Sequence, residues 1–158
     1  MRKRAVPGLQ DNAALHHEDW LHVEGLVDVE VTSEDLAYPV ECALLPDSSA
    51  GWRAAGPGPQ TIRLHFRPPQ RLTRIWLSFV ESERERTQEY TLRWSSHYGE
   101  SFREIVRQQW NFSPEGATRE IEDHYVELPS VTILELEIIP DVRVGTKAVA
   151  SLAQWRLA

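Results

Sequence analysis

Polar and apolar residues alternate along much of this chain, and strict alternation is typical of a strand that buries one face. In the segment 61–66, Ile62, Leu64 and Phe66 share one side, and polar residues take the other. Similar alternation or short apolar runs predict further strands at 21–31, 38–45, 72–80, 89–94, 102–106, 119–128, 131–139 and 148–157. The pattern therefore indicates a succession of about eight or nine short strands.

Turn and loop signals separate these segments. Pro68-Pro69 is expected to end the strand 61–66, because proline donates no hydrogen bond to a neighbouring strand. Stretches rich in glycine, serine or charge predict loops at 47–60, 81–88, 95–101 and 140–147. No long helical period and no internal repeat intervenes. Short strands at this spacing predict an all-β antiparallel sandwich or barrel.

The length of 158 residues fits one domain that can bury a substantial core. We expect this domain to span 19–158. Residues 1–18 are polar, contain Pro7-Gly8 and show no sustained period, which predicts a flexible N-terminal tail. Cys42 is the only cysteine, so an internal disulfide and a multi-cysteine zinc site are excluded.

Composition narrows the classes of function. The net charge of -7 argues against nucleic-acid or membrane-surface binding driven by bulk charge. No apolar run approaches the roughly 20 residues of a membrane span, and no secretory signal follows the basic start, so a cytoplasmic location is the default expectation. The sequence motifs of serine hydrolases, phosphate-binding loops and zinc proteases are absent. We therefore expect a non-catalytic protein without cofactor or metal.

Four local patterns follow one another along the chain, at 43–52, 61–79, 90–105, and 134–140 with 150–157. The first contains Ala43, Leu44, Asp47 and Trp52, and the third contains Gly99 and Phe102. In this order they resemble the discoidin or coagulation factor 5/8 type C domains, within the galactose-binding-like β-sandwiches. The resemblance covers about residues 20–158.

The resemblance implies a jelly-roll β-sandwich whose loops at one end bind ligands. Many members of the family bind carbohydrates. Others bind lipid headgroups or proteins, including a domain of a DNA-strand-break repair scaffold and a subunit of the anaphase-promoting complex. The fold by itself therefore does not fix the function.

The family resemblance also bears on calcium. Bacterial sugar-binding members often hold a structural calcium through acidic residues, at positions that correspond here to Leu45 and Gln154. Asp47 remains, but calcium takes about six to eight oxygen ligands, and carboxylates supply much of its affinity. We expect no calcium site.

The stretch QQWNFSPEG (108–116) places Trp110, Asn111 and Phe112 before a loop with proline and glycine. An aromatic ring offers an apolar face to a sugar, and asparagine offers a donor and an acceptor to hydroxyl groups. Trp110 and Phe112 are two positions apart, so on a strand both side chains would face the same side. The alternative interpretation is therefore that they form one aromatic wall of the core. Trp52 is expected to be structural, because in the family this tryptophan mostly packs under the ligand-binding loops.

Three further residues are candidates for ligand binding. Arg84 and Arg86 lie in the loop 81–88, a region from which sugar-binding members of the family often use an arginine or histidine to hold a hydroxyl group. Arginine geometry suits a diol or a carboxylate, although the surrounding glutamates also fit a solvated charged loop. His97 stands in the turn before Gly99, and turn chemistry explains the glycine but not the histidine.

Two hypotheses on function follow. The first is a non-catalytic module that binds a carbohydrate or another polyhydroxyl ligand through loops at one end of the sandwich. The alternative is an intracellular protein–protein interaction or assembly module of the same fold. A pit with aromatic residues beside Arg84 or Asn111 would favour a sugar, and a flat apolar patch around Trp76 would favour a protein partner.

Overall fold

A computed structural model describes residues 20–48 and 50–158, and the tail expected at 1–18 lies outside the described residues. The elements are the 3-10 helix η2 (Val23–Gly25), β1 (Val27–Val31), α2 (Glu41–Leu44), β2 (Trp52–Pro57), β3 (Gln60–Val80), β4 (Arg86–Ser95), β5 (Arg103–Phe112), β6 (Arg119–Ile139), β7 (Val149–Leu152) and β8 (Gln154–Leu157). All of the strand pairs are antiparallel.

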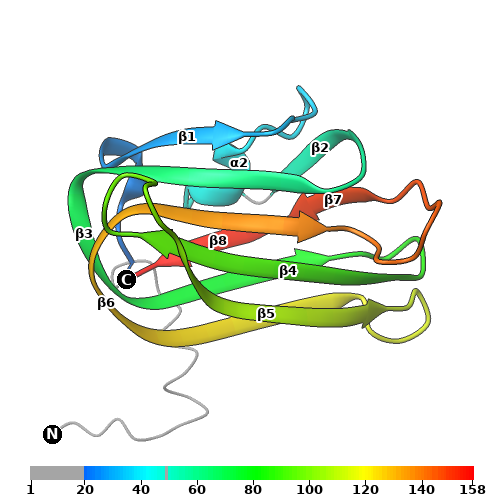
Figure 1. Ribbon diagram of the computed structural model, residues 1–158. Coiled ribbons are helices and arrows are strands. Elements are labelled where there is room, and N and C mark those ends of the chain that lie inside the picture. Colours follow the sequence, from blue (N-terminus) through cyan, green and yellow to red (C-terminus); the bar gives the residue numbers. More distant parts are fainter. Residues whose placement is uncertain (1–19, 49) are drawn as a thin grey trace, which may run out of the picture.

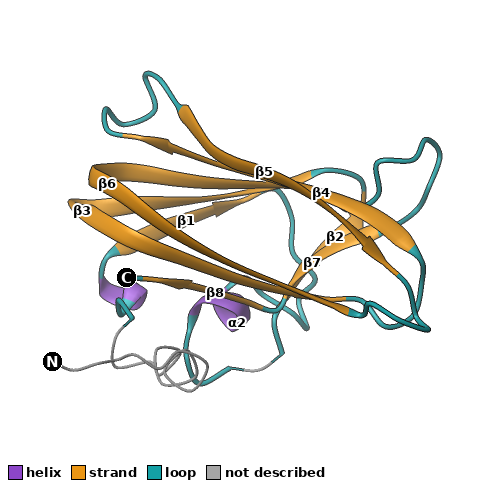
Figure 2. Ribbon diagram, turned by 90° about the horizontal axis from the view of Figure 1, so that it is seen from below, coloured by secondary structure: helices purple, strands orange, loops and turns teal. Residues whose placement is uncertain are grey.

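Two strands of 21 residues, β3 and β6, run through both layers of the molecule (Figures 1 and 2). Their pairing shifts register where Pro68-Pro69 and Pro129 occur, and prolines are tolerated where a ladder is interrupted. On one side of the bend Ile62 pairs with Leu136, and on the other Leu77 pairs with Glu122. The expected strand end at Pro68 is therefore wrong, because the strand bends there and continues.

The first layer has the strand order β1-β3-β6-β4-β5, and the second layer adds β8 beside β3. Strands β2 and β7 form a separate two-stranded sheet. This arrangement confirms the prediction of an all-β antiparallel sandwich. Three connections gather at one end of it, at the right of Figure 1, namely 81–85, 113–118 and 140–148. The bends of β3 and β6 and the turn 96–102 lie at the other end.

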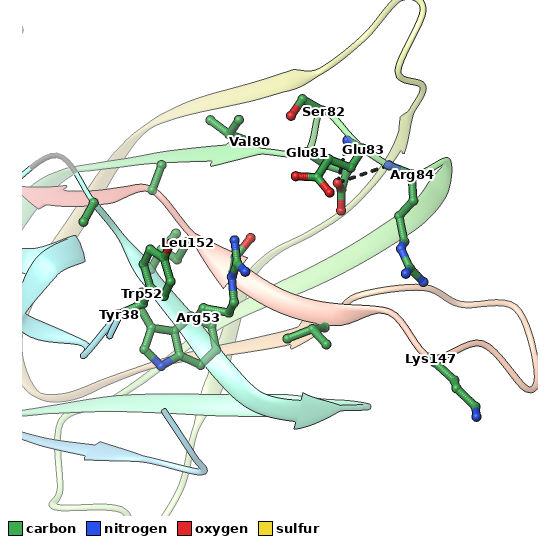
Figure 3. A pocket seen from close by; sticks show the side chains of 14 residues that line it. Tyr38, Trp52, Arg53, Val80, Glu81, Ser82, Glu83, Arg84, Lys147 and Leu152 are labelled. Atoms are coloured by element: carbon green, nitrogen blue, oxygen red, sulfur yellow. Dashed lines mark hydrogen bonds between the residues drawn. The ribbon is translucent and has the colours of Figure 1, made fainter. Parts of the chain in front are cut away.

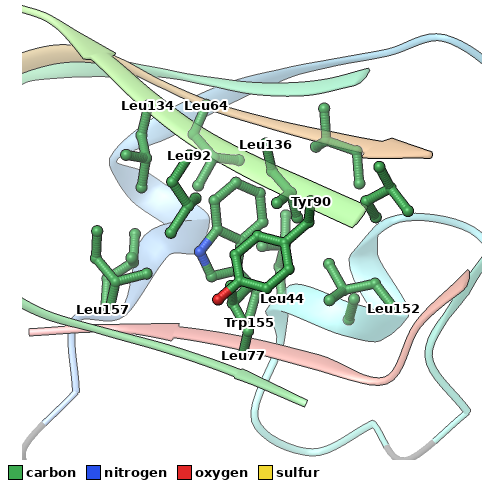
Figure 4. Packing of buried hydrophobic residues seen from close by; sticks show 14 of the residues in the cluster. Leu44, Leu64, Leu77, Tyr90, Leu92, Leu134, Leu136, Leu152, Trp155 and Leu157 are labelled. Carbon is green, nitrogen blue, oxygen red and sulfur yellow. The ribbon is translucent and has the colours of Figure 1, made fainter. Parts of the chain in front are cut away.

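The core lies between the layers and follows the alternation of the strands (Figure 4). Leu64 and Leu136 come from the first layer, Leu77 and Trp155 from the second, and each is at most 1% exposed. Burying a side chain of this size stabilises the fold by about 1.5–3 kcal/mol. The apolar positions that alternate in the sequence are thus the positions that hold the sandwich together.

Three further local predictions are wrong. The strand expected at 21–31 begins only at Val27, because Val23–Gly25 form the 3-10 helix η2. The apolar run 38–45, expected as a strand, contains the four-residue helix α2, whose Ala43 and Leu44 are buried. A short apolar run does not by its period distinguish a buried strand from a buried helical turn. The expected loop 47–60 contains β2, which pairs with β7, a partner almost 100 positions later.

Candidate functional site

A cleft of about 450 Å³ opens beside the connection 81–85 (Figure 3). Small-molecule sites in proteins commonly have volumes of about 300–1,000 Å³. Tyr38, Trp52 and Arg53 lie on one side of the cleft, and Arg84 projects from the connection 81–85 on the other side. Lys147 lines the outer end of the cleft, with its side chain directed away from Arg53. Segments far apart in the sequence thus meet at one end of the sandwich.

The first wall is built on a turn that pairs with β2. The backbone N–H of Tyr38 donates to the carbonyl oxygen of Asp35 at 2.8 Å, and the carboxylate of Asp35 accepts from the N–H of Ala37 at 2.9 Å. The N–H of Arg53 donates to the carbonyl oxygen of Tyr38 at 3.1 Å. The guanidinium of Arg53 lies 4.6 Å from the centre of the Tyr38 ring, a cation–π distance. Tyr38 and Arg53 are therefore held side by side.

The floor of the cleft depends on Trp52, which is 1% exposed and donates through Nε1 to the carbonyl oxygen of Ser33 at 3.0 Å. Gly51 precedes it with a φ of +77°. A Cβ atom at Gly51 would lie 2.8 Å from the carbonyl oxygen of Leu152, so only glycine fits without a shift. This close approach brings β2 against the junction of β7 and β8.

The opposite wall is a turn organised by Glu81. Its Oε2 accepts from the backbone N–H groups of Glu83 at 3.0 Å and Arg84 at 3.3 Å, and its Oε1 accepts from Nε of Arg86 at 2.7 Å. Burial alone would raise the pKa of Glu81, but these hydrogen bonds outweigh it and hold the pKa below its ordinary value. An ionised Glu81 thus fixes the backbone from which Arg84 projects.

The loop that leads to Lys147 is tied to the same turn. The guanidinium of Arg143 bonds Asp141 through Nη2 at 2.7 Å and also donates to the carbonyl oxygen of Glu85 at 2.8 Å. The N–H of Val142 donates to the carbonyl oxygen of Thr87 at 2.9 Å. The hydrogen bond from Arg143 holds the pKa of Asp141 below its ordinary value, against the effect of burial. These bonds hold the two loops beside each other.

The donors that face the cleft are available for a ligand. Within residues 20–48 and 50–158, the side chains of Arg84 and Lys147 make no hydrogen bond or ion pair. Both are exposed, and the guanidinium of Arg53 is engaged only with the Tyr38 ring. The cleft therefore combines an aromatic surface with hydrogen-bond donors that have no protein acceptor.

Among the residues expected to bind a ligand, Arg84 lines this cleft and Arg86 and Phe112 lie in the interior. Arg86 is 1% exposed, with its Nη1 donating to the carbonyl oxygen of Pro140 at 2.8 Å and to Oε1 of Gln88 at 3.0 Å. Its guanidinium lies 4.8 Å from the centre of the fully buried Phe112 ring. Neither side chain forms part of the cleft wall, because both are enclosed between the layers.

The remaining candidates lie elsewhere. Trp110 is half-buried against the core on the same side of β5 as Phe112, in agreement with their shared parity. Asn111 points to the opposite, outer face, where its Oδ1 accepts from the hydroxyl of Thr87 at 2.8 Å. His97 follows β4, whereas Arg84 precedes it, so the two lie about 30 Å apart at opposite ends of the sandwich. A ligand role for Trp110, Asn111 and His97 stays a prediction.

Tyr38, Arg53 and Lys147 were not among the sequence candidates. Tyr38 stood at the start of an expected strand, and Arg53 and Lys147 stood in expected loops without a motif. A basic residue beside Trp52 was the one available signal, since the sequence already placed that tryptophan under a ligand-binding end. The meeting of the three residues follows from the pairing of β2 with β7, which local patterns do not reveal.

Leu45, one of the two positions related to calcium binding, lies beside the buried Arg156. Nη1 of Arg156 donates to the carbonyl oxygen of Ala43 at 2.9 Å, and Nη2 donates to that of Leu45 at 3.2 Å. Burial lowers the pKa of Arg156 from its ordinary value. Among the described residues no three His, Cys, Asp or Glu side chains are placed to hold a metal ion together.

A second group of titratable residues lies inside the sandwich. Glu120, Glu122 and His124 alternate on the inner side of β6. Gln88 donates to Glu120 at 3.2 Å, and the hydroxyl of Tyr90 lies 2.7 Å from Nε2 of His124. Burial, together with the neighbouring Glu122, raises the pKa of Glu120 to about 9, and burial lowers that of His124. The fully buried Glu120 carboxyl is thus a neutral part of the core.

Comparison with known proteins bears on the fold. No protein-family model matches the chain, and no curated protein matches it. The CBM32 module of AlyQ, in complex with 4,5-unsaturated mannuronic acid, is 15% identical to this chain with a TM-score of 0.61. The alignment covers 84% of this chain and 95% of that chain. The family 32 module of C. perfringens NanJ, in complex with galactose, is 13% identical with a TM-score of 0.61, over 87% and 97%.

A structure of a different kind is equally similar. This structure is reduced XRCC1 bound to the DNA pol beta catalytic domain, and it is 12% identical to this chain with a TM-score of 0.61. The alignment covers 84% of this chain and 94% of that chain. The TM-scores show that this chain shares the fold of these structures, which confirms the discoidin-like β-sandwich fold expected from the sequence. None of the helices in the described part of the chain has the length and apolar character to cross a membrane.

Proposed function

We propose that this protein is a non-catalytic carbohydrate-binding module and that the cleft beside Arg84 is its binding site. The observation that carries the proposal is the cleft itself, where Tyr38 lies beside side-chain donors that have no acceptor within residues 20–48 and 50–158. Such a site can hold a sugar, whose C–H face packs on an aromatic ring and whose hydroxyl groups accept hydrogen bonds. The fold shared with the AlyQ and NanJ modules supports the same function.

The site is formed before a ligand arrives. The Asp35–Tyr38 turn, the Glu81 carboxylate and the Arg143–Glu85 bond fix the backbone on three sides. Only the ends of Arg84 and Lys147 need to become ordered on binding. A prepared site loses less conformational entropy, which increases affinity.

A protein partner at this end of the sandwich is the second candidate function. Leu36 is 93% exposed on the turn that carries Tyr38, and Val144 is fully exposed on the loop that leads to Lys147. Large apolar side chains in such positions can contact a protein. The patch around Trp76 that would have favoured this alternative is not exposed, since Trp76 is 8% accessible. The cleft therefore supports the carbohydrate hypothesis more directly.

Binding to a panel of neutral and acidic glycans, measured on an array and then by calorimetry, tests the proposal. We expect saturable binding of at least one glycan. Tyr38→Ala should weaken it about tenfold through the loss of aromatic contact. Tyr125→Ala is the matched control, because Tyr125 is an exposed tyrosine that does not line the cleft, and it should bind as the unchanged protein does. Absence of binding to every glycan by the folded protein, or equal loss in both variants, would refute the proposed site.

A further inference from the structure

We infer that the ligand of the cleft is an acidic saccharide, whose carboxylates are recognised by the positively charged side chains that line the cleft, Arg53, Arg84 and Lys147. This inference rests on the proposed function and adds the chemical class of the ligand. Three positively charged side chains line one cleft in a chain that has 17 lysines and arginines against 24 acidic residues. In a chain of net charge -7, such a cluster contrasts with the overall charge.

Most arginines of the described chain already have an acidic partner. Ion pairs with carboxylates engage Arg63, Arg67, Arg71, Arg74, Arg86, Arg93, Arg107 and Arg143. Arg84 and Lys147 have no such pair within the described residues, and Arg53 contacts an aromatic ring. Most of the described arginines outside the cleft are thus paired with a carboxylate, whereas none of the three cations that line it has such a pair within the described residues.

The carboxylates beside the cleft do not cancel this charge. Glu81 is bonded to Arg86 at 2.7 Å and to two backbone N–H groups, so its charge is already compensated. Glu83 is the other acidic residue of the lining, and it is exposed. Three cations therefore face one uncompensated carboxylate, and the local charge is positive.

The side chains also fit the geometry of a carboxylate. A guanidinium presents paired N–H donors that match the two oxygens of a carboxylate, and an ammonium adds a compact positive charge. Tyr38, held beside Arg53, supplies apolar surface for the sugar ring that bears the acid. A neutral sugar would use the same aromatic surface and hydrogen-bond donors but would bring no charge to compensate the cations.

The test compares three acidic polysaccharides with their carboxyl-reduced, neutral counterparts. The probes are polygalacturonate, alginate and hyaluronan, each immobilised and titrated with the protein at low and at high salt. We expect at least one acidic form to bind about tenfold or more tightly than its reduced counterpart. Binding should also weaken with salt, because exposed charges are screened.

Variants that remove one charge each test whether the preference for acidic forms arises in the cleft. Arg84→Gln and Lys147→Gln should each reduce binding of the acidic form about tenfold. They should reduce binding of a neutral form less, because glutamine keeps a hydrogen-bond donor and loses only the charge. Arg103→Gln is the matched control, because Arg103 is an exposed arginine at the opposite end of β4 from Arg84. Glu83→Gln should strengthen binding of the acidic form, a gain that misfolding cannot produce.

The outcomes separate the two proposals. If acidic and reduced forms bind equally, or if only neutral glycans bind, the proposed function stands and the acidic ligand is refuted. Binding of an acidic form that Arg84→Gln, Lys147→Gln and Arg103→Gln weaken alike would place the charge effect outside the cleft and also refute it. If the folded protein binds no glycan at all, the carbohydrate function fails and this inference fails with it.

Discussion

Nη1 of Arg156 on β8 donates a 2.9 Å hydrogen bond to the backbone carbonyl oxygen of Ala43, 113 positions earlier in the chain. Its Nη2 reaches the carbonyl oxygen of Leu45 at 3.2 Å, so one guanidinium joins the last strand to the end of α2. Arg156 is 8% exposed, and these carbonyl groups compensate for the burial of its charge. A side-chain cation thus organises the segment that leads to Trp52 and the cleft.

Replacement of Arg156 should therefore destabilise the protein. We expect Arg156→Ala to lower the free energy of unfolding by about 1–3 kcal/mol, because it leaves buried carbonyl oxygens without donors. Arg156→Lys should lower the free energy of unfolding by a smaller amount, because an ammonium replaces only part of the hydrogen bonding of the planar guanidinium. Urea denaturation measures both variants. A loss below about 0.5 kcal/mol in Arg156→Ala, as for an ordinary surface change, would contradict this role.

Calcium should leave the protein unchanged. The guanidinium of Arg156 already bonds the carbonyl oxygens of Ala43 and Leu45, and a calcium ion beside it would meet a like charge. We expect the same Tm in millimolar calcium and in a chelator. Because a ligand that binds only the folded state raises Tm, an increase of several degrees with calcium would show a metal site that this account excludes.

The stability of the protein should decrease as the pH rises toward 9, owing to Glu120. Burial raises the pKa of its carboxyl from 4.5 to about 9. Its contribution to stability is therefore fully present below pH 4.5 and is lost as the pH rises through the folded-state pKa. The slope from this group is at most about 1.4 kcal/mol per pH unit.

Glu120→Gln should remove that slope, because glutamine does not ionise. The free energy of unfolding of the variant minus that of the unchanged protein should therefore be larger at pH 9 than at pH 5. Denaturation at a series of pH values measures this difference. Glu127→Gln is the matched control, because Glu127 is exposed on the same strand. If the free energies of unfolding of the unchanged protein and of Glu120→Gln changed with pH in the same way, the Glu120 carboxyl would not be buried in its neutral form.

Gly51 should be intolerant of a side chain. Gly51→Ala places a Cβ atom 2.8 Å from the carbonyl oxygen of Leu152 and keeps a φ of +77°, so we expect destabilisation by about 1–3 kcal/mol. Gly116→Ala is the control, because nothing lies within 4 Å of a Cβ atom there. Its effect should stay within about 0.5 kcal/mol. Equal thermal stability of the two variants would argue against the close packing of β2 on the β7–β8 junction.

Much of the fold could be predicted because alternation is a local property. The segments 61–66 and 134–138 alternate strictly, and they pair in the first layer. The run 38–45 could not be assigned in the same way, because its apolar residues serve a buried helical turn. The continuation of β3 past Pro68-Pro69 also escaped prediction, since proline marks the end of a strand and a bend within one equally well.

The site could be predicted only in part. Arg84 was identified from its loop, but Arg86 was not distinguished from it. Extending the alternation of Tyr90 and Leu92 back to Arg86 places that residue on the core side, where the structure has it. Tyr38 and Lys147 line the same cleft because of tertiary pairing, and neither their local sequence nor their spacing indicates this.

The most direct test of the central claim is to map the binding site by NMR. Protein labelled with ¹⁵N would be titrated with the glycan that binds most tightly in the panel, and backbone amide shifts would be followed. The account predicts the largest shifts at Tyr38, Arg53, Arg84 and Lys147, with the amide of His97 unchanged. Shifts centred on the turn of His97, or on the outer face at Asn111, would contradict it.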